Sequence, residues 1–329
     1  MSFDFRSHYR STALFVLAAL TAGCSSGALT PGNSGNVTGA QAASLRLNQM
    51  LAAGHGVSAP AARAGSGGWF HPDKKGKKSL IYWGNFDNST ITIYSGKGVN
   101  GKEVGQITTG LSEPERLFVG ADGSVYATNI GNDTVTGYKA GTTSPFITIS
   151  NGVNSPTGLT VDAAGTIYCA NVGNDTITVY PKGQTTPSLT ISYFAEYLAT
   201  DKQDNLYAAG SGVEEFAPGS SSGKNLGLPA YPGALEVDRS GNLIVLYGGD
   251  VEYFPAGSTS PSKEISVSGS PFALSLSKNE KELYVSTEVS VPFDIQSIAY
   301  PKGTSFSNKL TTNGGDWPFA VSPDAALGD

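Results

Sequence analysis

Two glutamates, Glu115 and Glu196, have the positions in this 329-residue chain that most suggest chemistry. Both occupy the same place in copies of a repeated unit. Paired carboxylates about 5–9.5 Å apart can share the acid and base roles of glycoside hydrolysis. The two units that carry these glutamates are not adjacent, so we favour solvated charges over a catalytic pair. Arg116 directly follows Glu115 and could pair with it.

Several other reaction classes are disfavoured by what the repeated units lack. The three histidines, His8, His55 and His71, all precede the first unit. Nucleophilic catalysis of the Ser/His/Asp or Cys/His kind needs an imidazole base and is therefore disfavoured. The chain has no Gly-Lys-Ser/Thr phosphate loop and no zinc-ligand cluster. A net charge of -6 argues against binding of nucleic acid, which needs clustered Lys and Arg.

The elements that position these residues follow from a repeat. An aromatic residue is followed three positions later by glycine at a spacing of about forty residues. The copies are Tyr138–Gly141, Tyr180–Gly183, Phe216–Gly219, Phe254–Gly257 and Tyr300–Gly303, with a less regular first copy at Tyr94. A period of this length indicates one supersecondary unit that is copied and stacked. We predict that the motif marks the end of a strand and the turn beyond it.

Two of the units align closely, and they define the strands. Residues 114–138 match residues 156–180 with an offset of 42 throughout. Each unit contains a short strand, an Asp/Gly turn, an alternating strand through a tyrosine, a Gly-Asn-Asp turn and a third strand. Residues 141–149 and 183–191 add a fourth. Six such units predict an all-β fold, a six-bladed β-propeller.

The ends of the chain predict how the ring closes. The first unit begins at Ser79 with a second strand and lacks a first strand. Residues 317–324 match the first strand at 271–277, so the C-terminal strand is expected to complete the first blade. Closure removes the exposed edges that an open array would leave. The predicted propeller spans residues 69–329.

In a propeller, the loops that enter each first strand and leave each second strand meet on one face. The residues after the proline-equivalent positions form one predicted ring: Phe319, Glu115, Thr157, Glu196, Gly233 and Phe272. The residues that end the second strands form another: Asn85, Asn129, Asn171, Gly210, Tyr247 and Thr287. On this face the predicted ligand-binding residues are Glu115, Arg116, Glu196, Tyr197, Tyr247, Phe272 and Phe319. Aromatic side chains suit a glycan or a partner protein.

The unit from Pro156 to Asn171 resembles the NHL-type repeat found in gluconolactonase-like proteins, the virginiamycin B lyase group and many bacterial lipoproteins. The resemblance implies the fold and says little about function, because such propellers host unrelated activities. Resemblance to the gluconolactonase-like enzymes implies a divalent metal such as Ca²⁺, held by Glu115 or Glu196 with Asn129 or Asn171. The asparagines recur before Gly-Asn-Asp, which favours a structural role in a turn. A lyase of the virginiamycin B type would need a channel histidine, and the repeats have none.

The N-terminus resembles a bacterial lipoprotein signal. Arg6 and Arg10 precede an apolar run over 12–22, and Leu20-Thr-Ala-Gly leads into Cys24, the predicted lipidation site. An ordinary secretory signal with an incidental cysteine is the alternative. Ser25 resembles the outer-membrane sorting pattern. We predict a signal peptide over 1–23 and a Gly/Ala/Ser-rich tether over 24–68, with a short helix possible at 41–53. Cys169, the only other cysteine, is expected to be a buried and inert thiol.

These observations favour a lipid-anchored binding or scaffold module of the cell envelope, without a cofactor. Its partner would be an envelope protein or a glycan, and it would meet the membrane through its lipid anchor only. The alternative is a metal-dependent hydrolase or lactonase of the gluconolactonase-like kind.

Overall fold

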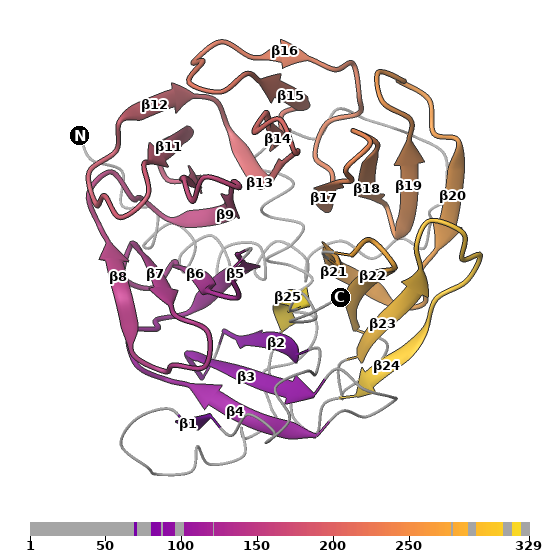
Figure 1. The fold of residues 1–329 in the computed structure, drawn as a ribbon. Coiled ribbons are helices and arrows are strands. Elements are labelled where there is room, and N and C mark those ends of the chain that lie inside the picture. The colour runs from indigo at the N-terminus through magenta and orange to yellow at the C-terminus, as the bar shows by residue number, and fades with distance from the viewer. Residues whose placement is uncertain are drawn as a thin grey trace, which may run out of the picture. The chain divides into compact units, whose positions relative to one another are not determined.

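The computed structural model describes residues 69–70, 80–86, 88–95, 102–120, 122–277, 279–288, 294–311 and 318–323. All of them belong to one compact unit, Ser58–Asp329. Their regular elements are all β-strands, in six antiparallel sheets that form a ring (Figure 1). The predicted six-bladed propeller is confirmed. The predicted signal, tether and short helix lie outside the described residues. Among the residues that the structure describes, no helix has the length and apolar character needed to span a membrane.

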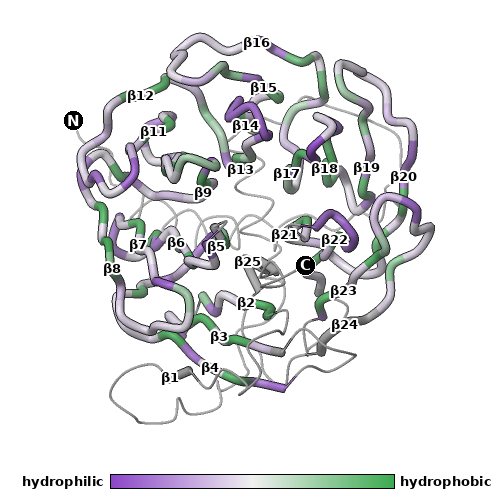
Figure 2. The backbone as a smooth tube through the Cα atoms, viewed as in Figure 1, coloured by the Kyte–Doolittle hydropathy of each residue, from purple (hydrophilic) through white to green (hydrophobic). Residues whose placement is uncertain are grey.

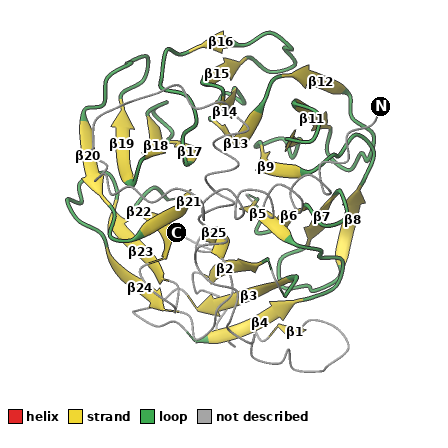
Figure 3. Ribbon diagram, turned by 180° about the vertical axis from the view of Figure 1, so that it is seen from behind, coloured by secondary structure: helices red, strands yellow, loops and turns green. Residues whose placement is uncertain are grey.

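Each sheet contributes one innermost strand to the middle of the ring (Figures 1 and 3). These strands are β25 (Pro318–Pro323) of blade 1, β5 (Pro114–Val119) of blade 2, β9 (Pro156–Val161) of blade 3, β13 (Ala195–Thr200) of blade 4, β17 (Ala234–Val237) of blade 5 and β21 (Ser270–Leu276) of blade 6.

The other strands follow outward in chain order. The second strands are β2 (Leu80–Asn85), β6 (Val125–Asn129), β10 (Ile167–Asn171), β14 (Leu206–Gly210), β18 (Leu243–Tyr247) and β22 (Glu282–Glu288). The third strands are β3 (Thr90–Ser95), β7 (Thr134–Tyr138), β11 (Thr176–Tyr180), β15 (Val213–Phe216), β19 (Asp250–Phe254) and β23 (Asp294–Ala299). The outer strands are β4 (Glu103–Ile107), β8 (Pro145–Ile149), β12 (Leu189–Ser192), β16 (Lys224–Asn225), β20 (Lys263–Ser266) and β24 (Ser307–Thr311).

The C-terminal strand closes the ring as predicted. β25 pairs antiparallel with β2, with Ile81 opposite Pro323 and Trp83 opposite Val321. Blade 1 differs from the prediction in one respect, because it has five strands. The short strand β1 (Trp69–Phe70) pairs with β4 and places Trp69 opposite Gln106. The added strand covers part of an outer edge that would otherwise expose unpaired backbone groups.

In blades 2 to 5 the repeated aromatic residue ends the third strand, as the sequence predicts. Tyr138 and Tyr180 are fully buried. Their hydroxyls donate hydrogen bonds of 2.7 Å to the backbone oxygens of Thr109 and Asn151, in the connections that enter the same blades. The glycines three residues further on have positive φ, 73° at Gly141 and 76° at Gly183, a conformation that favours glycine. The repeat is therefore scaffold.

The apolar core lies between neighbouring sheets. Hydrophobic stretches recur in all six blades (Figure 2). The largest cluster joins blades 4, 5 and 6 and includes Tyr197, Leu235, Ile244 and Leu274. Cys169 lies fully buried in blade 3, and burial raises the pKa of its thiol, so it has the properties of an inert core residue.

Candidate functional site

Five of the six innermost strands, all except β17, show a shift in register or β-bulge near their first residues, and this irregularity affects which side chains reach the centre. In blade 2, Pro114 lies opposite Asn129 and Arg116 opposite Thr128, which leaves Glu115 as the extra residue. Glu196 is the extra residue in blade 4 in the same way. The pairings of β21 and β25 shift at the equivalent places. Bulges turn side chains away from regular alternation and are frequent beside functional sites.

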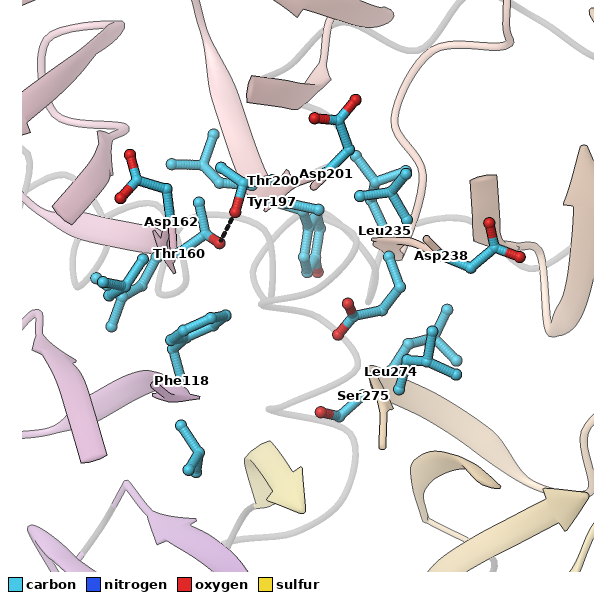
Figure 4. A pocket seen from close by; sticks show the side chains of 18 of the residues that line it. Phe118, Thr160, Asp162, Tyr197, Thr200, Asp201, Leu235, Asp238, Leu274 and Ser275 are labelled. Atoms are coloured by element: carbon cyan, nitrogen blue, oxygen red, sulfur yellow. Dashed lines mark hydrogen bonds between the residues drawn. The ribbon is translucent and has the colours of Figure 1, made fainter. Parts of the chain in front are cut away.

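Beyond the bulges, five innermost strands enclose a cavity of about 340 Å³ at the centre of the ring (Figure 4). This volume lies within the range of about 300–1,000 Å³ typical of small-ligand sites. The rings of Phe118 and Tyr197 extend into it, and Thr160 lies 3.3 Å from Thr200 between their hydroxyl oxygens. Ser275 adds a third hydroxyl to the lining.

Arg116 and Tyr197 meet inside this cavity although they come from blades 2 and 4. The guanidinium carbon of Arg116 lies 4.5 Å from the centroid of the Tyr197 ring, which is a cation–π contact. Blade 3 has Gly158 at the equivalent place. A Cβ there would lie 2.9 Å from Ala170 Cβ and 3.0 Å from the backbone oxygen of Glu196. The missing side chain therefore lets strands β9 and β13 approach closely.

Glu236 of β17 also lines the cavity. Burial raises the pKa of its carboxyl to about 8, against the lowering effects of the Leu276 backbone N–H and the positive charge of Arg116. The carboxyl is therefore mostly protonated at neutral pH, so it can donate a hydrogen bond there. The cavity thus combines a guanidinium, a neutral carboxyl group and an aromatic face.

The sequence predicted Arg116 and Tyr197 for this face but missed Glu236. The predicted ring placed Gly233 of blade 5 at the centre. The structure brings in the residues four positions after the proline-equivalent: Phe118, Thr160, Ala199, Glu236 and Ser275. Glu236 is the one charged residue among these five. That departure from the repeat was the signal available in the sequence.

Glu115, Glu196 and Tyr247 are not among the described residues that line the cavity. The side chain of Glu115 is buried, at 8% exposed, and that of Glu196 is partly buried. Tyr247 donates its hydroxyl to the backbone oxygen of Pro229 at 2.8 Å and packs edge-on against Phe254. Phe272 lies in β21 and Phe319 in β25, and for both residues the structure describes the backbone only.

The asparagines proposed as metal ligands are used inside their blades. Asn129 donates to Thr136 Oγ1 at 3.0 Å, and its Oδ1 accepts the Ser112 N–H at 3.2 Å. Asn171 donates to Thr178 Oγ1 at 3.0 Å, and its Oδ1 accepts the Asn154 N–H at 3.0 Å. Both are almost completely buried. Their amide oxygens face N–H donors, so the two asparagines do not fit a metal site in this arrangement.

Three aspartates lie where the cavity meets the turns after the innermost strands: Asp162, Asp201 and Asp238. Each accepts backbone N–H groups of its own turn, such as Thr166 N–H at 2.8 Å for Asp162. Burial raises the pKa of Asp238, but hydrogen bonds from Tyr300 and Asn242 outweigh it and leave that pKa below its usual value. Among the described residues, no three or more His, Cys, Asp or Glu side chains are grouped to hold a metal ion.

Comparison with known proteins supports the fold. No family model and no curated protein matches the chain. A nidogen/laminin complex structure matches with a TM-score of 0.63 and 16% identity, covering 75% of this chain and 99% of that one. A Bacteroides caccae protein of unknown function gives 0.57 and 12%, with coverage of 75% and 99%. A catalytically inactive virginiamycin B lyase from Staphylococcus aureus with quinupristin gives 0.51 and 12%, with coverage of 78% and 88%. At these identities the similarity concerns the fold.

Proposed function

We propose that this six-bladed propeller is a binding module that takes a small molecule, or an exposed end group of a glycan or protein, into its central cavity. The contact between Arg116 and Tyr197, at 4.5 Å, carries the proposal. It joins two non-adjacent blades inside a cavity of about 340 Å³, and no other copy of the repeat has an arginine at that place. Charged and aromatic groups that converge in a concave site are the usual pattern of ligand recognition.

The structural neighbours are consistent with binding but do not identify the ligand. One of them belongs to a protein complex and another holds quinupristin. The same architecture is thus found with a macromolecular partner and with a small molecule. The cavity of this chain favours a group small enough to enter about 340 Å³.

A screen of small molecules tests the proposal. Ligand-observed NMR with a library of small polar fragments should give hits with the wild-type protein that Arg116→Ala loses. Lys224→Ala, which removes an exposed cation from the outer strand β16, is the matched control and should keep the hits. Hits that persist in Arg116→Ala, or an equal loss in both variants, would place binding outside the cavity.

We also propose that the propeller is held at the cell envelope by lipid on Cys24, with the outer membrane as destination. The support is the Leu20-Thr-Ala-Gly-Cys24 segment after a short apolar run. In bacteria expressing the full chain, Cys24→Ser should abolish labelling with radioactive palmitate, whereas Cys169→Ser should leave it intact. Unchanged labelling of Cys24→Ser would refute the anchor without touching the binding proposal.

A further inference from the structure

We infer that the ligand of the central cavity presents a carboxylate group, which accepts hydrogen bonds from the Arg116 guanidinium and from the carboxyl group of Glu236. This inference rests on the proposed binding function. It assigns a chemical class to the occupant: a small carboxylic acid, free or as the acidic end group of a larger molecule.

The geometry of Arg116 favours a carboxylate. The guanidinium carbon of Arg116 lies 4.5 Å from the centroid of the Tyr197 ring, so the aromatic ring holds this cation at the cavity. A guanidinium presents its N–H donors as a planar fork, which binds a planar carboxylate through two parallel hydrogen bonds that a lysine cannot reproduce.

Glu236 supplies a second reason. An ionised glutamate would repel an incoming carboxylate, whereas a protonated one donates a hydrogen bond to it. Burial keeps the Glu236 carboxyl mostly protonated at neutral pH. Two acidic groups can share one proton when the site disfavours two charges.

The charged groups around Glu236 support this assignment. The described residues that line the cavity include the cations Arg116, Lys202 and Arg239 and the anions Asp162, Asp201, Asp238 and Glu280. The three aspartates are held by the backbone N–H groups of their own turns, and Glu280 pairs with Arg239 at 3.6 Å. Of these charged groups, Arg116 is the one that changes the pKa of Glu236, which it lowers.

The remainder of the lining suggests what accompanies the carboxylate. Phe118, Leu235 and Leu274 provide apolar surface, and Thr160, Thr200 and Ser275 provide hydroxyl groups. A ring with some hydroxyl substituents suits this mixture. Uronic acids and aromatic acids are therefore suitable probes.

Two isosteric pairs of probes isolate the carboxylate. Benzoate and glucuronate should bind the purified full chain, as measured by calorimetry, at least about tenfold more tightly than benzamide and glucuronamide, which have the same shape without the charge. Arg116→Gln should weaken the acids about tenfold or more. Arg116→Lys keeps the charge and should recover only part of the affinity. Lys224→Gln is the control.

The pH dependence tests the role of Glu236. As the pH rises from 7 to 9 the protonated fraction of a group with a pKa near 8 falls about tenfold, so wild-type affinity for the acids should fall about tenfold. Glu236→Gln keeps a donor that cannot ionise, and its affinity should stay nearly constant over this range. Equal pH dependence in both proteins would overturn the assignment of Glu236.

The outcomes separate this inference from the binding function beneath it. Acids and amides that bind equally well, with both lost in Arg116→Gln, would leave the cavity as a binding site and overturn the carboxylate assignment. Absence of Arg116-dependent binding for all four probes would overturn both. Melting curves of every variant keep loss of folding distinct from loss of binding.

Discussion

The protonation of Glu236 makes the stability of the folded protein depend on pH. Its carboxyl ionises with a pKa near 4.5 in the unfolded chain and about 8 in the folded protein. The folded state therefore retains a proton that the unfolded state has lost between these values. The stabilising contribution is complete below pH 4.5 and disappears as the pH rises through 8.

This linkage predicts the behaviour of Glu236→Gln, which has no proton to lose. Relative to wild type, its free energy of unfolding should be similar at pH 4 and roughly 4–5 kcal/mol higher at pH 9, because ionising wild-type Glu236 in the folded protein costs about 1.4 kcal/mol for each pH unit between the two pKa values. Urea denaturation at the two pH values measures this difference. If Glu236→Gln has the same free energy of unfolding as wild type at pH 9, Glu236 ionises with its ordinary pKa in the folded protein.

Asn171 tests the structural role of the recurring asparagines. Asn171→Ala removes the bonds to Thr178 Oγ1 and the Asn154 N–H and leaves buried partners unsatisfied. We expect a loss of about 2–3 kcal/mol of stability. Asn151→Ala, an exposed side chain, should cost little. Millimolar Ca²⁺ should not change either difference, and stabilisation by Ca²⁺ that depends on Asn171 would favour the metal-site alternative.

The sequence predicted some of the residues that line the cavity and missed others. Arg116 and Tyr197 could be identified because they follow the marker positions of their blades. Glu236 was missed because the predicted ring used the residue after the proline-equivalent position, which is Gly233 in blade 5, whereas β17 brings the residue three positions later to the cavity. Repetition predicted a structural role in a turn for the asparagines, and Asn129 and Asn171 form their hydrogen bonds inside their own blades.

At the scale of elements, the spacing of neighbouring innermost strands determines whether Arg116 can reach Tyr197. Strand β9 lies between them in the ring, and it carries Gly158 where β5 carries Arg116. A Cβ at Gly158 would come within 3.0 Å of the Glu196 backbone oxygen. Backbone atoms cannot yield as a flexible side chain can, so a larger residue would displace β13.

Gly158→Ala should therefore destabilise the protein by about 1–3 kcal/mol. It should also weaken binding of benzoate, because β13 carries Tyr197. Gly212→Ala is a suitable control, since its nearest neighbours lie at 3.4 and 3.9 Å, ordinary contact distances. Thermal melting and calorimetry of the two variants provide the comparison. Equal effects of both substitutions would show that strand spacing at Gly158 is unimportant.

Most elements could be predicted from the sequence because the repeat presents the same strand pattern six times. The alternating second strands and the glycine turns after the third strands lie where the pattern indicates. Strand β1 could not be predicted, since Trp69 and Phe70 precede the repeat and their pairing with β4 is long-range. Local periodicity carries no information about such a partner.

At the scale of the whole molecule, ring closure brings the six innermost strands together. β25, the last described strand, pairs with β2 of blade 1, and it also contacts β5 and β21. The cavity therefore depends on both ends of the repeated region. The blades that form it share a scaffold and differ in the residues that face the centre.

Truncation after residue 316 removes β25 and should abolish cooperative folding. The loss would expose the edge of β2, and an unpaired edge promotes aggregation. Circular dichroism and size-exclusion chromatography of the truncated chain measure the outcome, and removal of residues 325–329 alone is the control. A monomeric truncation after residue 316 with a sharp melting transition would contradict closure of the ring by β25.

The position of a bound acid is the most direct test that the central cavity binds a carboxylate through Arg116. A crystal structure of the purified protein with glucuronate should show the carboxylate against the Arg116 guanidinium, with Glu236 within hydrogen-bond distance and Tyr197 still in contact with the arginine. Glucuronate bound outside the central cavity, or in the cavity with its carboxylate directed away from Arg116, would contradict it.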